Sequence, residues 1–175
     1  MLKESELKIL NYLTLDEDGA EFVSQIARDV GISKGEVSKA IQVLKHGGFV
    51  KTELKGRNMV CSVKRTSVVS QKLRMAFNLL EVMPKLESLK KYALKIVLFG
   101  SCAQGVDIAK SDIDIFVITK DKIEINKAVQ KIKFSRPAQW IVKTPQEYVI
   151  LNIKERVFAE EIGKGITLWE TDETT

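Results

Sequence analysis

The sequence predicts an α+β protein with two domains, and three observations lead to this prediction. In the first third of the chain, an amphipathic basic helix with a capping motif is followed by a short β-hairpin. In the second half, two apolar strand-like runs flank a Gly-Ser pair and an Asp-x-Asp motif. The 175 residues are 45% hydrophobic, which is enough to bury a core in each part. We expect domains at residues 1–66 and 93–175, joined by a helical connector at residues 67–92.

Composition excludes several functional classes. No apolar run approaches the roughly 20 residues of a membrane span, and the first ten residues do not resemble a signal peptide. The two cysteines, Cys61 and Cys102, are far apart and form neither a disulfide framework nor a zinc-binding spacing. The single histidine argues against a zinc site and against a Ser-His-Asp triad. We therefore expect a cytoplasmic protein that has no membrane partner.

The positive charge is concentrated in one stretch of the chain. Residues 1–32 contain three basic and seven acidic side chains, a net charge of −4, whereas residues 33–65 contain eight basic and two acidic ones, a net charge of +6. The whole chain has a net charge of only +5. Such a stretch is either an ordinary solvated surface or a contact surface for nucleic acid, and the local structure decides between them.

A helix is expected from Ser33 to His46. The preceding short helix ends at Gly31, which suits a left-handed C-terminal position, and Ser33 with Glu36 forms an S-x-x-E capping box. One face of the helix is apolar and consists of Val37, Ala40, Ile41 and Leu44. The candidate DNA-contacting residues lie on the polar and basic side of the same segment and are Ser33, Lys34, Ser38, Lys39, Gln42 and Lys45.

A basic hairpin follows this helix. Two strand-like runs, FVKTEL and MVCSV, flank KGRN, so Lys55 and Arg57 lie at the tip. His46 is interpreted as the helix C-terminus and not as a metal ligand. Helix, short helix, capped basic helix and basic hairpin together resemble a winged helix-turn-helix domain, which implies binding to double-stranded DNA. Winged helices also serve as protein-interaction modules, and this alternative remains open.

The connector shows apolar residues at helical spacing, namely Val69, Leu73, Ala76, Phe77 and Leu80. Pro84 is expected to end this helix. The apolar face either packs between the domains or pairs with its copy in a homodimer, and we favour the homodimer.

The C-terminal part contains the chemically informative motif, LFGSCAQGVDIAKSDIDIF. A buried strand through Phe99 leads into Gly100-Ser101, and a second strand contains Asp112 and Asp114. Alternating residues of a strand share a face, so these two carboxylates are expected on one face and Ile113, Ile115 and Val117 on the other. Paired carboxylates are typical ligands of Mg²⁺, and a Gly-Ser turn allows the backbone to approach a phosphate.

The combination of strand, Gly-Ser, Asp-x-Asp and strand is similar to the signature of the polymerase-beta-type nucleotidyltransferases, in particular the minimal ones. The resemblance covers about residues 90–170 and implies a mixed α/β domain that binds Mg²⁺ (or Mn²⁺) and a nucleoside triphosphate. It implies that Gly100 and Ser101 hold the triphosphate and that Asp112 and Asp114 are the catalytic metal ligands.

The sequence departs from the active members of this family at two positions. These members have a third carboxylate on a later strand, which here corresponds to AQWIVK, and no Asp or Glu occurs between Glu124 and Glu147. Gln139 occupies the expected position, but an amide cannot accept a proton at neutral pH. Glu147 is interpreted as part of a capping box with Thr144. Cys102 stands where close relatives often have a basic residue.

The primary interpretation is a DNA-binding regulator with a domain that binds Mg²⁺ and nucleotide and has incomplete catalytic machinery. The alternative is an active enzyme that transfers AMP to a hydroxyl of a protein, an RNA or a small molecule. A third interpretation is an antitoxin that pairs with a small helical partner protein, because minimal nucleotidyltransferases resemble components of toxin–antitoxin modules.

Overall fold

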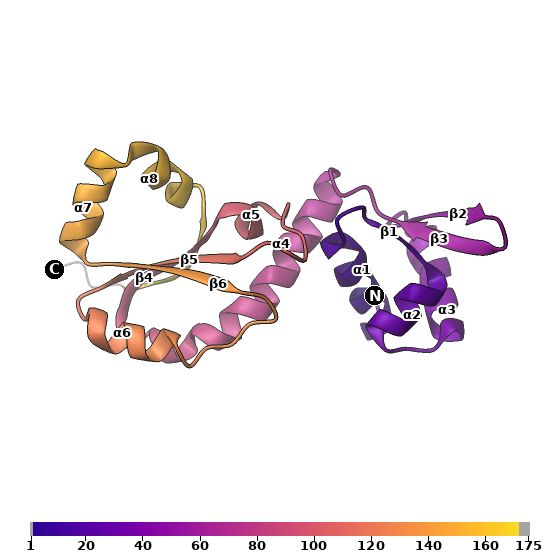
Figure 1. Cartoon of the computed structure of the whole chain (residues 1–175), viewed down its shortest axis with the longest axis horizontal. Helices are drawn as coiled ribbons and strands as arrows, with labels where there is room; N and C mark the ends of the chain where they lie inside the picture. Colours follow the sequence, from indigo (N-terminus) through magenta and orange to yellow (C-terminus); the bar gives the residue numbers. More distant parts are fainter. Residues whose placement is uncertain (1, 172–175) are drawn as a thin grey trace. The chain divides into compact units, whose positions relative to one another are not determined.

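The computed structural model describes residues 2–171, and the ends of both predicted domains, residue 1 and residues 172–175, lie outside this range. The chain divides into two compact units. The N-terminal unit contains the residues up to Arg74 and also Gly105–Ala109, whereas the C-terminal unit contains Met75–Gln104 and the residues from Lys110 onward. The elements, shown in Figure 1, confirm the predicted mixed α+β class. Within the described residues, no helix is both long and apolar enough to cross a membrane.

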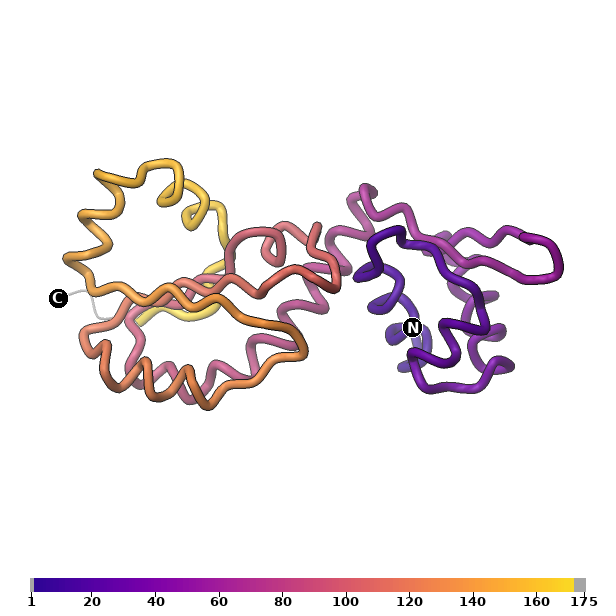
Figure 2. Tube along the Cα trace, viewed as in Figure 1, coloured from indigo at the N-terminus to yellow at the C-terminus, as the bar shows by residue number. Residues whose placement is uncertain are grey.

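The N-terminal unit combines three helices with a small antiparallel sheet in the order β1-β3-β2. Its elements are α1 (Glu4–Leu15), β1 (Ala20–Phe22), α2 (Val23–Val30), α3 (Lys34–His46), β2 (Lys51–Lys55) and β3 (Asn58–Ser62). The strand β1 was not predicted; it pairs with β3 over three residues only. Figure 2 shows the β2–β3 hairpin extending away from the helices of its own unit.

The helix α3 forms as the sequence predicts. The Ser33 hydroxyl accepts a hydrogen bond from the backbone N–H of Glu36 at 3.1 Å, and Gly31 adopts a left-handed conformation with φ of 74°. The helix ends at His46, as expected. The four residues of the predicted apolar face are all buried, namely Val37, Ala40, Ile41 and Leu44. Burial of this face leaves the basic face of α3 in solvent.

The C-terminal unit is built on a four-stranded sheet in the order β6-β5-β4-β7. Its strands are β4 (Ala93–Phe99), β5 (Ile113–Thr119), β6 (Ala138–Lys143) and β7 (Ile166–Glu170). Its helices are η1 (Met83–Leu89), α5 (Gly100–Gln104), α6 (Lys122–Val129), α7 (Pro145–Lys154) and α8 (Arg156–Gly163). The β5–β6 pair is parallel, and the pairs that β4 makes with β5 and β7 are antiparallel.

Both faces of this sheet are covered, as Figure 1 shows. Ile113, Ile115 and Val117 belong to the core on one face, together with buried residues of η1 and α6. Phe116 and Ile118 belong to the core on the other face, together with residues of α7 and α8. The predicted alternation along this strand is confirmed, and it places the even-numbered residues of β5 beneath α7 and α8.

The connector helix α4 (Val68–Val82) buries a face other than its apolar stripe within the single chain. Val69 is 57% exposed and Leu80 is 72% exposed, although both belong to the apolar stripe expected to pack. The buried residues of α4 are instead polar over most of its length and are Ser70, Arg74, Asn78 and Val82. Hydrogen bonds and an ion pair allow these polar side chains to be buried. The favoured homodimer would leave the apolar stripe exposed on a single chain, so pairing of this stripe stays a prediction.

An ion pair is fully buried in the N-terminal unit. The Arg74 Nε atom lies 3.2 Å from Asp107 Oδ2, and the two side chains are 3% and 0% exposed. The Arg74 Nη1 atom also donates to Asn11 Oδ1 at 2.6 Å. The guanidinium group is thus held by a carboxylate and by an amide oxygen of α1.

Replacing Arg74 with alanine is expected to lower the free energy of unfolding by about 3–5 kcal/mol, because the Asp107 carboxylate would stay buried without its charged partner. Urea denaturation of the full chain measures this loss. The control is Lys8→Ala, which removes an exposed ion pair with Glu4 and should cost no more than about 1 kcal/mol. Equal losses in the two variants would contradict a stabilising role for the buried pair.

Candidate functional site

The Gly-Ser pair and the Asp-x-Asp motif meet at one end of the C-terminal sheet. Gly100 follows the last residue of β4, and Phe99 pairs with Asp114 of β5. Gly100 has a φ of 65°, and a Cβ atom placed on it would lie 2.5 Å from Asp114 Oδ2. Only glycine leaves this space free, so the backbone at the Gly-Ser pair lies directly against the Asp114 carboxylate.

The two aspartates differ in their surroundings. The strand β5 begins at Ile113, so Asp112 lies just before it and is exposed, whereas Asp114 lies within it and is half-buried. Burial raises the pKa of Asp114, and the nearby carboxylates of Asp112 and Glu161 raise it further. A carboxylate surrounded by other carboxylates attracts a cation, as a metal site requires.

Replacing Asp114 with asparagine is expected to raise the melting temperature at neutral pH in metal-free buffer. The folded protein favours the protonated form of Asp114, because the pKa of this group is raised on folding. As the pH rises above 3.8, the ordinary pKa, the wild type must ionise Asp114 and loses stability. The asparagine variant carries no such charge and does not lose this stability. The gain of the variant should therefore disappear as the pH approaches that value. Thermal denaturation over a pH series measures the effect.

A matched control for this variant is Glu160→Gln, which removes one negative charge from an exposed position of α8. If Asp114→Asn raises the melting temperature at neutral pH less than the control does, the negative charge of Asp114 is not unfavourable in the folded protein.

Glu161 is a candidate site residue that the sequence did not indicate. It lies on α8, and the Phe158 ring, one turn earlier, packs edge-on against Phe99 at 5.8 Å between centroids. Since Phe99 pairs with Asp114, this contact brings α8 close to the acidic pair. Glu161 also borders a hollow of about 520 Å³ that residues 153–158 line. No local motif marks this glutamate, because its position depends on how α8 packs on the sheet.

An amide side chain lies at the position where the sequence led us to expect a third carboxylate. Asp114 is paired in register with Gln139 of the parallel strand β6, as the sequence suggested. Gln139 is exposed and lies in the same cross-strand position that an additional acid would need. Within residues 2–171, no group of three or more Asp, Glu, His or Cys side chains is arranged to hold a metal ion.

Glu147 caps the N-terminus of α7. Its carboxylate accepts the backbone N–H of Thr144 at 2.8 Å, and the Thr144 hydroxyl accepts the N–H of Glu147, which completes the predicted capping box. Both oxygens of Glu147 also lie 2.9 Å from the Lys122 amine. The capping interaction with Thr144, together with Lys122, lowers the pKa of Glu147. This glutamate therefore does not replace the missing acid.

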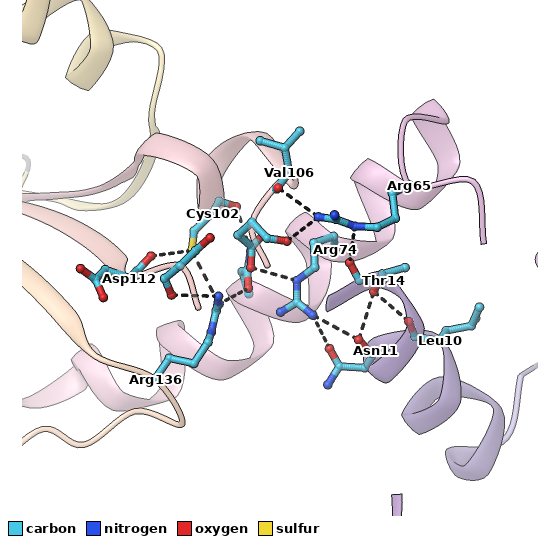
Figure 3. A network of polar contacts seen from close by, with 12 residues as sticks. Leu10, Asn11, Thr14, Arg65, Arg74, Cys102, Val106, Asp112 and Arg136 are labelled. Carbon is cyan, nitrogen blue, oxygen red and sulfur yellow. Dashed lines mark hydrogen bonds and ion pairs between the residues drawn. The ribbon is translucent and has the colours of Figure 1, made fainter. Parts of the chain in front are cut away.

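A polar network, part of which is shown in Figure 3, holds Cys102 and Asp112 together. The Cys102 thiol donates to the backbone carbonyl of Asp112 at 3.3 Å, and Asn78 donates to the carbonyl of Cys102 at 3.0 Å. Arg136 donates to the Asn78 side chain at 3.1 Å and to the carbonyl of Ser111 at 3.2 Å. The Cys102 side chain is therefore buried against the backbone of Asp112, and the basic side chain next to it is Arg136, which the sequence did not indicate.

The predicted DNA-contacting side chains are all exposed on the N-terminal unit. Ser33 is used as the N-cap of α3, and the Ser38 hydroxyl donates to the carbonyl of Lys34 at 2.9 Å. A hollow of about 240 Å³ lies between α3 and the tip of the hairpin and is lined by Val23, Ser24, Lys34, Ser38, Arg57, Asn58 and Met59. The fold thus brings part of the helix set and part of the hairpin set to one surface. The remaining exposed members of the two sets are Lys39, Gln42, Lys45 and Lys55.

Comparisons with known proteins agree with the C-terminal geometry. Residues 83–174, just over half of the chain, match the family described as polymerase beta, nucleotidyltransferase. A search of curated proteins gives no significant match. AF1382 from Archaeoglobus fulgidus is 21% identical over 46% of this chain and 92% of its own, with a TM-score of 0.39.

A second solved structure, the hypothetical protein PyrSV_gp04 from Pyrobaculum spherical virus, is 22% identical over 53% of this chain and 58% of its own. Its TM-score is 0.31. At these low TM-scores neither likeness carries an argument about function.

Proposed function

Because the chain belongs to the polymerase beta nucleotidyltransferase family, we propose that it is a cytoplasmic DNA-binding regulator whose C-terminal unit binds a nucleoside triphosphate. The observation that carries this proposal is the register of β5 and β6, which sets Gln139 against Asp114. The ligand-binding half of the family site is present and the proton-accepting half is replaced by an amide.

In this proposal, Gly100 and Ser101 hold the triphosphate, and Asp112 and Asp114 hold Mg²⁺ or Mn²⁺. Mg²⁺ in such sites is bound by one or two protein carboxylates together with substrate phosphates. The acidic pair fits this donor set, and the absence of a side chain on Gly100 allows the Asp114 carboxylate to lie against the backbone of the Gly-Ser pair. A bound metal ion would supply neutralisation of phosphate charge. The role of the chain is to position the triphosphate and to fix its Mg²⁺ contacts.

The N-terminal unit is proposed to be a winged helix that binds double-stranded DNA, with α3 in the major groove. The buried apolar face of α3 leaves its basic face free, and a helix of this size fits the groove. Lys34 and Ser38 line the same hollow as Arg57 at the hairpin tip. One duplex can therefore contact helix and hairpin together, through phosphates and base edges.

Calorimetric titration with ATP, in the presence and absence of Mg²⁺, tests the nucleotide site. We expect binding that depends on Mg²⁺ and that is lost in the double variant Asp112→Asn/Asp114→Asn. The matched control is Glu160→Gln, on an exposed position of α8 that has no role in the proposed site. Absence of binding for ATP and for the other three ribonucleoside triphosphates would refute the nucleotide-binding proposal.

The second candidate function is transfer of AMP to a hydroxyl of a protein, an RNA or a small molecule. It is favoured by Glu161, whose charge acts on Asp114 and which lies on α8, where Phe158 packs against Phe99 at the end of β4. In this reaction the acceptor oxygen forms a bond to the α-phosphorus as the bond to pyrophosphate breaks. The hydroxyl proton passes to Glu161 or to solvent. Transfer of label from α-labelled ATP, lost on Glu161→Gln, would support this function over simple binding.

A partner protein is the remaining part of the proposal. Four large apolar side chains on α7 and α8 are at least half exposed, namely Val149, Ile150, Ile153 and Val157. Exposed apolar groups of this kind are typical of contact surfaces. They support a small helical partner, as in an antitoxin role, or a homodimer. Co-purification with the product of a neighbouring gene and the mass of the purified protein in solution distinguish these two.

A further inference from the structure

The segment between Ser101 and Asp112 is built into the other unit of the protein. Gly105–Ala109 belong to the compact N-terminal unit, although the residues immediately before and after them belong to the C-terminal unit. This segment, which we call the bridging loop, therefore joins the proposed phosphate-binding residues to the proposed metal ligands by way of the N-terminal unit. The C-terminal unit could have formed its own sheet without a loop that packs in the N-terminal unit.

Arg65 holds the first half of the bridging loop, as Figure 3 shows. Its guanidinium donates to the backbone carbonyls of Val106 at 3.1 Å and Asp107 at 2.9 Å. The same group donates to the carbonyls of Thr14 at 3.3 Å and Glu17 at 3.0 Å, at the C-terminal end of α1. One side chain thus joins the loop to α1 through four hydrogen bonds.

Arg74 holds the middle of the loop through its buried ion pair with Asp107, and it also contacts Asn11 of α1. The backbone N–H of Ala109 donates to the carbonyl of Leu15, the last residue of α1, at 3.0 Å. The bridging loop is therefore fixed to α1 along most of its length. Since α1 packs directly against α3, a shift of the proposed recognition helix reaches the loop through few contacts.

The residues on either side of the bridging loop belong to the proposed nucleotide site or adjoin it. Gln104 ends α5, the short helix that begins at Gly100. On the other side, Ser111 and Asp112 are held by Arg136 and by the Cys102 thiol. The bridging loop is thus continuous in the chain with both halves of the proposed site.

We propose that Arg65 and Arg74 are positioning residues through which DNA bound to the N-terminal unit and Mg²⁺-nucleotide bound to the C-terminal unit change each other's affinity. This inference rests on the proposed function. Coupling of this kind is reciprocal: DNA must change the ATP affinity by the same factor by which ATP changes the DNA affinity. A structural role for the two arginines would lower stability without any such reciprocity.

The experiment measures Mg²⁺-ATP affinity with and without a saturating mixed-sequence DNA duplex at low ionic strength, and DNA affinity with and without saturating Mg²⁺-ATP. In the wild type we expect the same factor from both measurements, of about 5-fold or more. Arg65→Gln removes the two guanidinium bonds to the carbonyls of Val106 and Asp107 and leaves the buried ion pair between Arg74 and Asp107 in place. We expect the Arg65→Gln variant to bind ATP alone and DNA alone within about 3-fold of the wild-type affinities. In this variant, neither ligand should change the affinity for the other.

Two further variants complete the test. Asp107→Asn keeps the shape of the side chain but removes the charge that pairs with Arg74, so it should lower the stability and also reduce the factor. Arg28→Gln, on the exposed end of α2, should leave the factor unchanged. Retention of the full factor in both loop variants, or independent binding of ATP and DNA in the wild type, overturns the coupling alone. Failure of the wild type to bind nucleotide refutes the proposed function and the coupling with it.

Discussion

Replacing Gln139 with glutamate is expected to accelerate pyrophosphate release from ATP by about 10²–10⁴-fold, the usual contribution of a general base. Gln139 is paired in register with Asp114 on the neighbouring parallel strand, so the two side chains lie on the same face of the sheet. Glutamate has the shape of glutamine and supplies the proton acceptor that the amide lacks. Because Gln139 is exposed, ionising the new carboxylate costs little desolvation.

Pyrophosphate release is the suitable measurement because it does not depend on which acceptor is used, and water serves by default. Gln139→Asn is the matched control, since it changes the side chain without adding a base. Adding Asp112→Asn to the glutamate variant should abolish the gain, because proposed metal binding is lost. Equal rates in the glutamate and asparagine variants would contradict the view that the missing acid is what limits catalysis.

The features that the sequence predicted well depend on neighbouring residues. The start and end of α3 follow from Ser33 and Gly47, and its buried face follows from four apolar residues at helical spacing. The capping box of Glu147 and the alternation along β5 are equally local. The pairing of Gln139 with Asp114 also agrees with the prediction from the family resemblance, whereas the role of this position stays a prediction.

The features that the sequence did not predict depend on residues far apart in the chain. Arg74 is buried in α4 only because Asp107, which follows 33 positions later, is buried against it. Asn78 and Arg136 meet across 58 positions, and both reach the Cys102 segment. Glu161 acts on Asp114 because α8 folds back over the sheet. Hydrophobic periodicity carries no information about such polar contacts, and so the buried polar face of α4 was not predicted.

The N-terminal unit yields the other large expected effect, on DNA binding. Replacing Lys34, Lys39 and Arg57 together with glutamine should weaken duplex binding on the order of 10²-fold at low salt. Each cation that neutralises a phosphate releases a counterion, so removing three contacts should also flatten the plot of log K against log salt by about 2.7. Lys34 and Arg57 line the same hollow, so we expect the substitutions to remove contacts of both the helix and the hairpin with a single duplex.

The salt dependence separates a DNA interface from a general effect of charge. A control in which Lys127, Lys131 and Lys133 of the C-terminal unit become glutamine removes the same charge from a different surface. It should lower affinity only slightly and leave the slope close to that of the wild type, because these lysines are not among the proposed phosphate contacts and only such contacts release counterions. If the N-terminal triple variant keeps the wild-type slope, the basic face of α3 does not contact phosphates. A protein partner then becomes the better interpretation of that face.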